Sequence, residues 1–294
     1  MIHQNDTGKL TNDFASTFNV TYFVEGIDYW RTNDLAILKT TMVPVSNTSR
    51  LHVASDIAFF RKVLQSSKHV HCLALDMRRD TTHRRIKPDF VHKMAQMRNN
   101  LLDSDVFLFL AGGTLLGWYR ECDIIPHTWD IDFGALSTEF SQSAEDHLWD
   151  LQDSASIRFY SRMGTLEDSR EYRFVESSSH VMIDLFLVYP DGEHSMYTAG
   201  TSLMTHKRYK WTIPKITELC SATLYSRHFF VPCNPVRHIE AEYGERWMVD
   251  IPTDTFQWFK SHANVRAERR LTEAEFAQQY KEYPPRHRIK RSVS

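Results

Sequence analysis

Residues 106–134 limit the possible folds of this chain more than any other stretch. They begin with a continuous apolar run from Val106 to Leu110, which is typical of a buried strand. Gly112 and Gly113 follow, and they allow a tight turn at which the backbone can come close to a ligand. The stretch ends in the alternating run 130–134, so it predicts a strand, a glycine turn, a short helix, a loop and a second strand.

The predicted helix after the glycines has features of a phosphate-binding site. Thr114 can cap this helix, and the first backbone N–H groups of a helix bind anions well. Arg120 falls at the end of the same helix, where its guanidinium can clamp a phosphate or a carboxylate. Gly112, Gly113, Thr114 and Arg120 are therefore candidate substrate-binding residues.

Asp130 and Asp132 flank Ile131 in the second predicted strand. On one strand their carboxylates point to the same side, with Cα atoms roughly 7 Å apart. Two carboxylates this close repel each other, so either one takes up a proton or a cation lies between them. A divalent cation that prefers oxygen ligands is the usual solution. The alternative is a solvated pair on an edge strand, but the position directly after a glycine turn and helix favours the metal.

A third carboxylate lies within a second apolar run. Asp184 has apolar neighbours on both sides in residues 179–189, which predicts a central strand. An ionised carboxylate in such a strand is costly unless it binds a metal or pairs with a cation, for which Arg120 and Arg173 are candidates. We favour the metal, because three carboxylates on neighbouring strands beside a glycine turn match the layout of nucleotidyltransferase-type phosphoryl transfer.

The order and spacing of these motifs resemble those of the LicD and fukutin family. The resemblance spans residues 96–281, whereas the preceding residues resemble the family's additional N-terminal domain only weakly. It rests on the segments Gly113–Arg120, Cys122–His127, Trp129–Asp132, Ile183–Phe186, Val231–Pro235 and Tyr243–Trp247 and on Trp258.

The resemblance implies a nucleotidyltransferase-like fold and the transfer of a phospho-alcohol from a cytidine diphosphate donor to a sugar. Members of the family transfer phosphocholine, or ribitol 5-phosphate from CDP-ribitol onto the O-mannosyl glycan of a secretory-pathway glycoprotein in the Golgi. The metal-binding acidic residues of the family fall on Asp130 and Asp132, with the later strand carboxylate at Asp184. The resemblance therefore implies a CDP-alditol transferase in which these three residues are catalytic and hold Mg²⁺ or Mn²⁺.

Other functions stay open at this point. The donor can be CDP-choline or CDP-glycerol, or the pair Asp130 and Asp132 can serve a glycosyltransferase that uses a nucleotide sugar. A different class is a non-catalytic Golgi scaffold that binds glycan or partner enzymes. The sequence does not identify the alcohol, the acceptor glycan, the metal or the oligomeric state, and a homo-oligomer is among the open states.

A basic and aromatic run begins at Lys207 and ends at Trp211. It can hold a diphosphate or stack against a cytosine or a sugar ring, so Lys207 and Trp211 are further candidate substrate-binding residues. A packed surface tryptophan is an equally good interpretation.

The arrangement of predicted elements indicates an α+β chain. We expect a small α/β N-terminal domain with a basic linker over residues 1–87, a catalytic domain with a mixed sheet flanked by helices over 88–283, and a basic disordered tail over 284–294. The other expected elements are helices over 55–67, 88–102, 138–151, 234–243 and 271–280 and strands over 69–75, 157–160, 171–176 and 180–189.

Composition excludes little but limits the possible partners. A formal net charge of −2 over 294 residues gives no basic excess, so we do not expect nucleic acid as the main partner. The four cysteines form no C-x-x-C pair. Cys220 and Cys233 flank one predicted hairpin and can form a disulfide or, with His206 and His228, a zinc site. Buried free thiols are the default expectation.

Targeting signals are scarce in this sequence. No apolar run approaches the ~20 residues of a membrane helix, and the first residues are not typical of a signal peptide. The Golgi lumen that the resemblance implies would then require a membrane anchor from a segment absent here. Glycosylation sequons at Asn5, Asn19 and Asn47 mildly favour a luminal chain.

Overall fold

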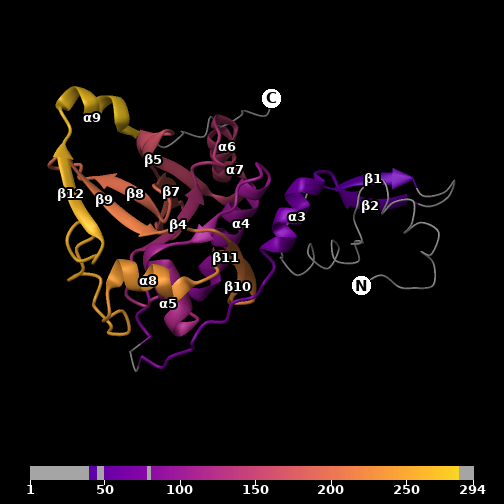
Figure 1. Ribbon diagram of the computed structural model, residues 1–294, viewed down its shortest axis with the longest axis horizontal. Coiled ribbons are helices and arrows are strands. Elements are labelled where there is room, and N and C mark those ends of the chain that lie inside the picture. The colour runs from indigo at the N-terminus through magenta and orange to yellow at the C-terminus, as the bar shows by residue number, and fades with distance from the viewer. Residues whose placement is uncertain (1–39, 45–49, 78–80, 285–294) are drawn as a thin grey trace, which may run out of the picture.

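The computed structural model describes residues 40–44, 50–77 and 81–284 (Figure 1). A large mixed sheet flanked by helices forms the body, which confirms the expected α+β class. The sequons at Asn5, Asn19 and Asn47 lie outside the described residues, as does nearly all of the expected tail.

The large sheet places the two predicted acidic strands side by side. Across it the strands follow the order β10 (Leu219–Leu224), β11 (Arg227–Pro232), β3 (Phe109–Leu110), β4 (Asp130–Leu136), β7 (Met182–Asp191), β6 (Asp168–Glu176), β5 (Ile157–Thr165) and β13 (Lys281–Glu282). Strands β4 and β7 are parallel, whereas β3 with β4 and β6 with β7 are antiparallel. The far end of β7 also pairs with β8 (Ser195–Thr201). Strand β8 pairs with β9 (Lys207–Pro214), which pairs with β12 (Val265–Arg270).

Helices cover the sheet in two groups. The first contains α4 (Val91–Leu102), which follows the short 3₁₀ helix at Pro88–Phe90, together with α6 (Gln142–His147) and α7 (Leu151–Ala155). The second contains α5 (Gly112–Glu121) and α8 (Pro235–Tyr243), which contact each other and lie on the other side of β4 in Figure 1. Helix α9 (Glu273–Gln279) lies near the C-terminal end and contacts β5.

Most predicted helices form, although their boundaries differ. Helix α8 agrees best with the helix predicted over 234–243, because Asn234 caps its start and Gly244 caps its end. The expected helix 138–151 begins later and is interrupted by a 3₁₀ turn at Leu148–Asp150.

The apolar run 106–110 is buried throughout, but only its last two residues are a strand. Asp105 adopts a left-handed backbone conformation, and the N–H of Val106 bonds back to Leu101 O at 3.0 Å. The first three residues of the run therefore belong to the connection that follows helix α4, not to the strand. Only Phe109 and Leu110 reach partners in β4 and β11.

The N-terminal part contains a hairpin of β1 (Thr40–Pro44) and β2 (Arg50–Ala54), followed by α3 (Ile57–Gln65). The predicted strand 69–75 is wrong, because these residues form a single bridge, between His69 and Ser221, and otherwise bond irregularly. The N–H of Leu73, for example, donates to Tyr119 O of α5 at 2.7 Å. The domain boundary at residue 87 stays a prediction.

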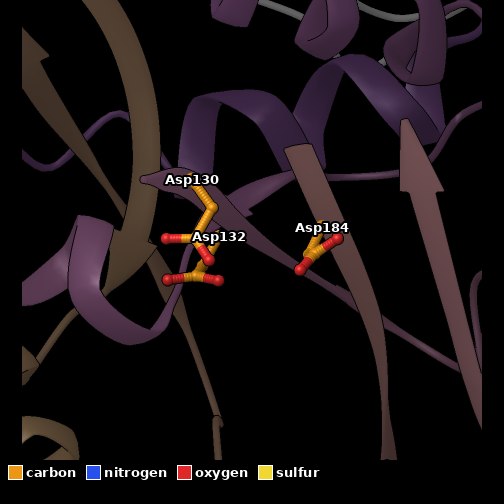
Figure 2. A group of neighbouring side chains, drawn as sticks. All are labelled: Asp130, Asp132 and Asp184. Atoms are coloured by element: carbon orange, nitrogen blue, oxygen red, sulfur yellow. The ribbon is translucent and has the colours of Figure 1, made fainter. Parts of the chain in front are cut away.

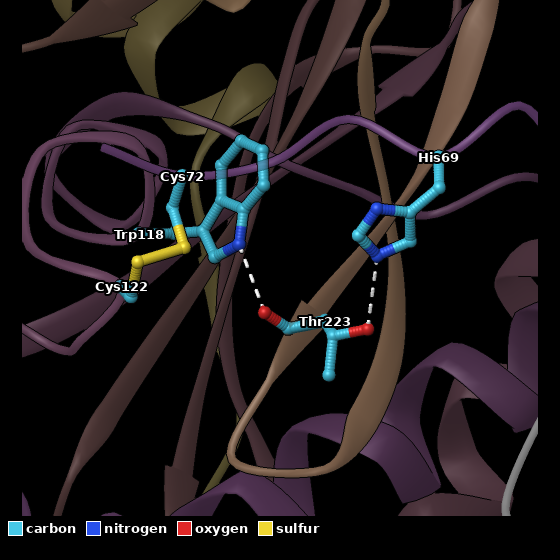
Figure 3. Close-up of a disulfide and its surroundings, with 5 residues drawn as sticks. All are labelled: His69, Cys72, Trp118, Cys122 and Thr223. Atoms are coloured by element: carbon cyan, nitrogen blue, oxygen red, sulfur yellow. Dashed lines mark hydrogen bonds between the residues drawn. A yellow bond between two sulfur atoms is a disulfide. The ribbon is translucent and has the colours of Figure 1, made fainter. Parts of the chain in front are cut away.

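All four cysteines are paired. Cys220–Cys233 links β10 to the end of β11, which confirms that alternative, while the default of free thiols and the zinc site with His206 and His228 are wrong. The second disulfide, Cys72–Cys122, was not predicted, and it joins the irregular segment to the residue after α5 (Figure 3). Beside it, Trp118 Nε1 donates to Thr223 O at 3.0 Å. The disulfide therefore fixes residues 69–75 against the end of α5, while the contact between His69 Nε2 and Thr223 Oγ1, at 3.1 Å, holds the same segment against β10 (Figure 3).

Within the described part of the chain, every helix is too short or too polar to cross a bilayer.

Candidate active site

Strands β4 and β7 bring the three predicted carboxylates together. Their parallel register places Asp132 directly beside Asp184, and Asp130 lies two residues earlier on β4. One oxygen atom from each of the three side chains lies within 4.8 Å of the others (Figure 2). We call Asp130, Asp132 and Asp184 the acidic cluster.

The acidic cluster is electrostatically unfavourable without a cation. Burial raises the pKa of Asp132 well above its ordinary value, and the nearby carboxylates of Asp130, Asp184 and Glu242 raise it further. Burial also raises the pKa of Asp130, with a second contribution from Asp184. Like charges at this separation favour either a bound proton or a bound metal.

Asp184 has a cationic partner as well as acidic neighbours. Arg173 on β6 donates to both of its oxygens, from Nε at 2.7 Å and from Nη2 at 2.8 Å. The cationic partner that the sequence offered for Asp184 is thus present, and it is Arg173 rather than Arg120. Metal binding by Asp184 stays a prediction. Carboxylate oxygens that accept from an arginine keep lone pairs for a metal.

The glycine turn lies directly against Asp132. The Gly113 N–H donates to Asp132 Oδ2 at 3.0 Å, and Gly112 has a φ of 48°, a conformation that favours glycine. A Cβ at Gly112 would lie 2.8 Å from Asp132 Oδ2. The turn therefore requires glycine, because any side chain at this position would clash with the Asp132 carboxylate.

Thr114 does not cap helix α5, contrary to expectation. The helix begins at Gly112, and its cap residue, Ala111, offers no side-chain hydrogen bond. Thr114 is instead the third helical residue, and its Oγ1 accepts from the Asp132 N–H at 2.8 Å. It thereby fixes β4 against α5, and substrate binding by Thr114 stays a prediction.

Arg120 holds another part of the chain. Its buried guanidinium pairs with Glu121 at 2.5 Å and Asp250 at 3.4 Å and donates to Trp247 O at 3.0 Å. In the structure Arg120 thus anchors residues 247–250, and phosphate binding by Arg120 stays a prediction.

A cavity of about 910 Å³ extends from the acidic cluster to Trp211 and Trp258, which we call the aromatic wall. Gly112, Gly113, Arg120 and Trp211 line it, but Lys207 does not, since its Nζ lies against the Tyr209 ring at 5.9 Å. Lys207 is therefore not brought to the acidic cluster.

Three further carboxylates line the same cavity and were not predicted, namely Glu171, Glu242 and Asp250, the partner of Arg120. Glu171 lies two residues before Arg173 on β6, and burial raises its pKa to about 7. Glu242, at the end of α8, also has its pKa raised to about 7 by burial, and its Oε1 lies 3.2 Å from Nδ1 of His262. Strand alternation with Arg173 could have indicated Glu171. Nothing local marks Glu242, because α8 reaches the acidic cluster only through the tertiary fold.

The chain matches known proteins over this region. Residues 105–234 match the family described as LicD/FKTN/FKRP, nucleotidyltransferase domain. Uncharacterized proteins T07A5.1 and W02B3.4 of Caenorhabditis elegans are 35% identical over 227 residues and 31% identical over 237 residues. These matches cover 74% and 79% of this chain.

A third relative has a named activity. Ribitol-5-phosphate transferase FKTN of Homo sapiens is 36% identical over 157 residues, which is 53% of this chain. The matched segments span 58% and 60% of the two nematode proteins and 32% of the human one.

Proposed function

This chain belongs to the LicD and fukutin family, and we propose that it transfers a phospho-alditol, of the ribitol 5-phosphate type, from a CDP-activated donor to a protein-linked glycan. The observation that carries the proposal is the acidic cluster packed against the glycine turn in the lining of one cavity. The named activity of the human relative supports the ribitol type.

The residues of the acidic cluster fit a divalent cation. All three offer carboxylate oxygens, the ligands that Mg²⁺ and Mn²⁺ prefer. Arg173 compensates one charge, at Asp184, so burial and mutual repulsion still disfavour ionised Asp130 and Asp132 without a further cation. Asp130, Asp132 and Asp184 would hold the metal. When bound, it would neutralise charge on the donor diphosphate.

The chain's own groups would then position the two substrates. The backbone at Gly112 and Gly113 would lie against a donor phosphate, as at other helix starts. An acceptor hydroxyl oxygen forms a bond to the phosphorus that carries the alditol, the bond from that phosphorus to the bridging oxygen breaks, and CMP leaves. The hydroxyl proton passes to a carboxylate of the cavity, either Asp184 or its neighbour Glu171.

Disulfide bonding supports a place in the secretory pathway. Both disulfides together use every cysteine of the sequence, a pattern typical of oxidising compartments. We therefore propose that the protein acts in the lumen of the Golgi.

A donor panel tests the proposed function and separates it from its rivals. Purified protein is incubated with CDP-ribitol, CDP-glycerol, CDP-choline and a UDP-sugar, and nucleotide release is followed by chromatography. Release of CMP from CDP-ribitol above the other donors is the expected result. Preference for CDP-choline or CDP-glycerol would change the transferred group, and turnover of the UDP-sugar alone would indicate a glycosyltransferase. Glycan binding without turnover of any donor would favour the scaffold.

A further inference from the structure

Trp211 lines the cavity and has an unpaired hydrogen-bond donor in its side chain. Its side chain is buried, with 8% of its surface exposed, yet within the described chain Nε1 has no hydrogen-bond partner. A buried indole N–H normally finds an acceptor, because leaving it unpaired is costly. Its position in the cavity wall indicates that the missing acceptor belongs to a ligand.

A second polar group lies beside it. Thr198 on β8 is the register partner of Trp211 on β9, so the two side chains leave the same face of the sheet. Thr198 Oγ1 is also buried, lines the same cavity and lacks a partner among the described residues. Two neighbouring strands thus place two unpaired polar groups in the wall of one cavity.

The aromatic wall continues to a carboxylate on one side and to the cavity rim on the other. A Cβ at Gly200 would lie 3.4 Å from both Trp211 Cη2 and Glu171 Oε2, so the ring and the carboxylate border the same point. Trp258, with its ring centroid 5.7 Å from that of Trp211, is 42% exposed at the rim. An aromatic face, a carboxylate and two hydrogen-bonding groups suit a sugar ring, which has apolar C–H faces and a hydroxyl edge.

The strand order separates Glu171, at one edge of this wall, from the donor end. The glycine turn follows β3, on one side of β4, while Glu171 on β6 lies beyond β7 on the other side. The acidic cluster on β4 and β7 therefore lies between the two. Phosphoryl transfer places the attacking and leaving oxygens roughly in line, so a donor held at the glycine turn is attacked from the β6 side.

We propose that Thr198, Trp211, Trp258 and Glu171 form the subsite that binds the terminal sugar ring of the acceptor glycan. The proposal rests on the proposed function for the role of the sugar, although sugar binding itself does not require turnover. The Glu171 carboxylate accepts from a sugar hydroxyl, and Trp211 Nε1–H donates to one.

Ligand-observed saturation-transfer NMR tests the subsite without any donor. The probes are methyl pyranosides of glucose, galactose, mannose and N-acetylglucosamine, each measured with and without saturating CMP. We expect at least one pyranoside to bind and to remain bound in the presence of CMP. Absence of binding by all four, or displacement of the pyranoside by CMP, would overturn the proposal.

Single substitutions test whether the pyranosides bind at the aromatic wall. Trp211→Phe keeps the ring and removes the N–H, and Thr198→Val keeps the shape and removes the hydroxyl. Each is expected to weaken pyranoside binding about tenfold while CMP affinity stays unchanged. The matched control is Trp149→Phe, whose ring stacks on Phe159 away from the cavity lining.

The nucleotide is the rival occupant of the wall. Weaker CMP binding with unchanged pyranoside binding in Trp211→Phe would assign the wall to the nucleotide and refute the sugar subsite. Pyranoside binding at the wall without turnover of any CDP-alcohol would instead refute the proposed function and leave the sugar subsite standing.

Discussion

Asp132 lies where the glycine turn, strand β7 and helix α8 meet. Its Oδ2 accepts from the Gly113 N–H, its backbone N–H donates to Thr114, and Asp184 is its neighbour across the sheet. Burial raises its pKa, which means that a metal must compete with a proton for this side chain.

Asp132→Asn should therefore abolish most of the metal affinity. We expect Mn²⁺, followed by electron paramagnetic resonance, to bind at least about 100-fold more weakly, because removal of a direct ligand should exceed the effect of losing an outer partner. Asp153→Asn, an exposed position on α7, is the matched control and should bind Mn²⁺ as the unaltered protein does. Equal Mn²⁺ affinity in Asp132→Asn would remove Asp132 from the ligand set.

Glu242 makes stability depend on pH. Burial raises its pKa to about 7 from 4.5, so the folded protein binds more protons than the unfolded chain between these values. The free energy of unfolding then falls as pH rises from about 4.5 through 7. In metal-free buffer, Glu242→Gln should be more stable than the unaltered protein by about 1–3 kcal/mol at pH 8.

The difference in the free energy of unfolding between Glu242→Gln and the unaltered protein should vanish near pH 4.5. Urea unfolding at pH 4.5 and at pH 8 measures this difference. Glu240→Gln changes an exposed side chain on the same helix and should shift stability equally at both pH values. A gain for Glu242→Gln that is independent of pH would show that titration of Glu242 is not its cause.

At the scale of elements, the glycine turn at the start of α5 shapes the donor end of the cavity. Gly112→Ala should lower both Mn²⁺ affinity and CMP release at least tenfold, because its Cβ would contact Asp132 Oδ2. Gly192→Ala is matched to it, since Gly192 has a φ of 78° but nothing within 4 Å of its Cβ position. Both changes strain the backbone by about 1 kcal/mol. Equal loss of activity in both variants would attribute the effect to strain alone.

The disulfide Cys72–Cys122 ties an irregular segment to the end of α5. Replacing both cysteines with serine should lower the free energy of unfolding by about 2–4 kcal/mol, measured with urea. Replacing Cys220 and Cys233 should cost less, because their sequence separation is 13 rather than 50. A larger loss at Cys220–Cys233 would contradict this ranking.

At the scale of the whole molecule, the sequence predicted those parts of the site that local pattern encodes. Asp130 and Asp132 share one strand, and Asp184 was found because apolar neighbours leave a buried carboxylate to be explained. Glu242 and His262 were missed because α8 and the segment after it reach β4 only through tertiary packing. The disulfide Cys72–Cys122 was missed for the same reason, since its residues are brought together by docking of residues 69–75 on α5.

Local signals also misled at two points. Thr114 has the chemistry of a cap residue, but the glycines before it are already helical, so its hydroxyl faces β4 instead. Residues 69–75 have the apolar content of a strand, yet only His69 forms a bridge to β10, and the residues that follow bond to the end of helix α5 instead. The apolar content of a segment alone does not tell whether it pairs with a strand or packs against a helix.

Metal-dependent release of CMP from CDP-ribitol is the most direct test of catalysis at the acidic cluster. The unaltered protein should release CMP with Mg²⁺ or Mn²⁺, lose this activity with EDTA, and regain it when metal is restored. Asp132→Asn should stay inactive under all three conditions. Undiminished CMP release in EDTA, or full activity of Asp132→Asn, would contradict a metal held by carboxylates from β4 and β7.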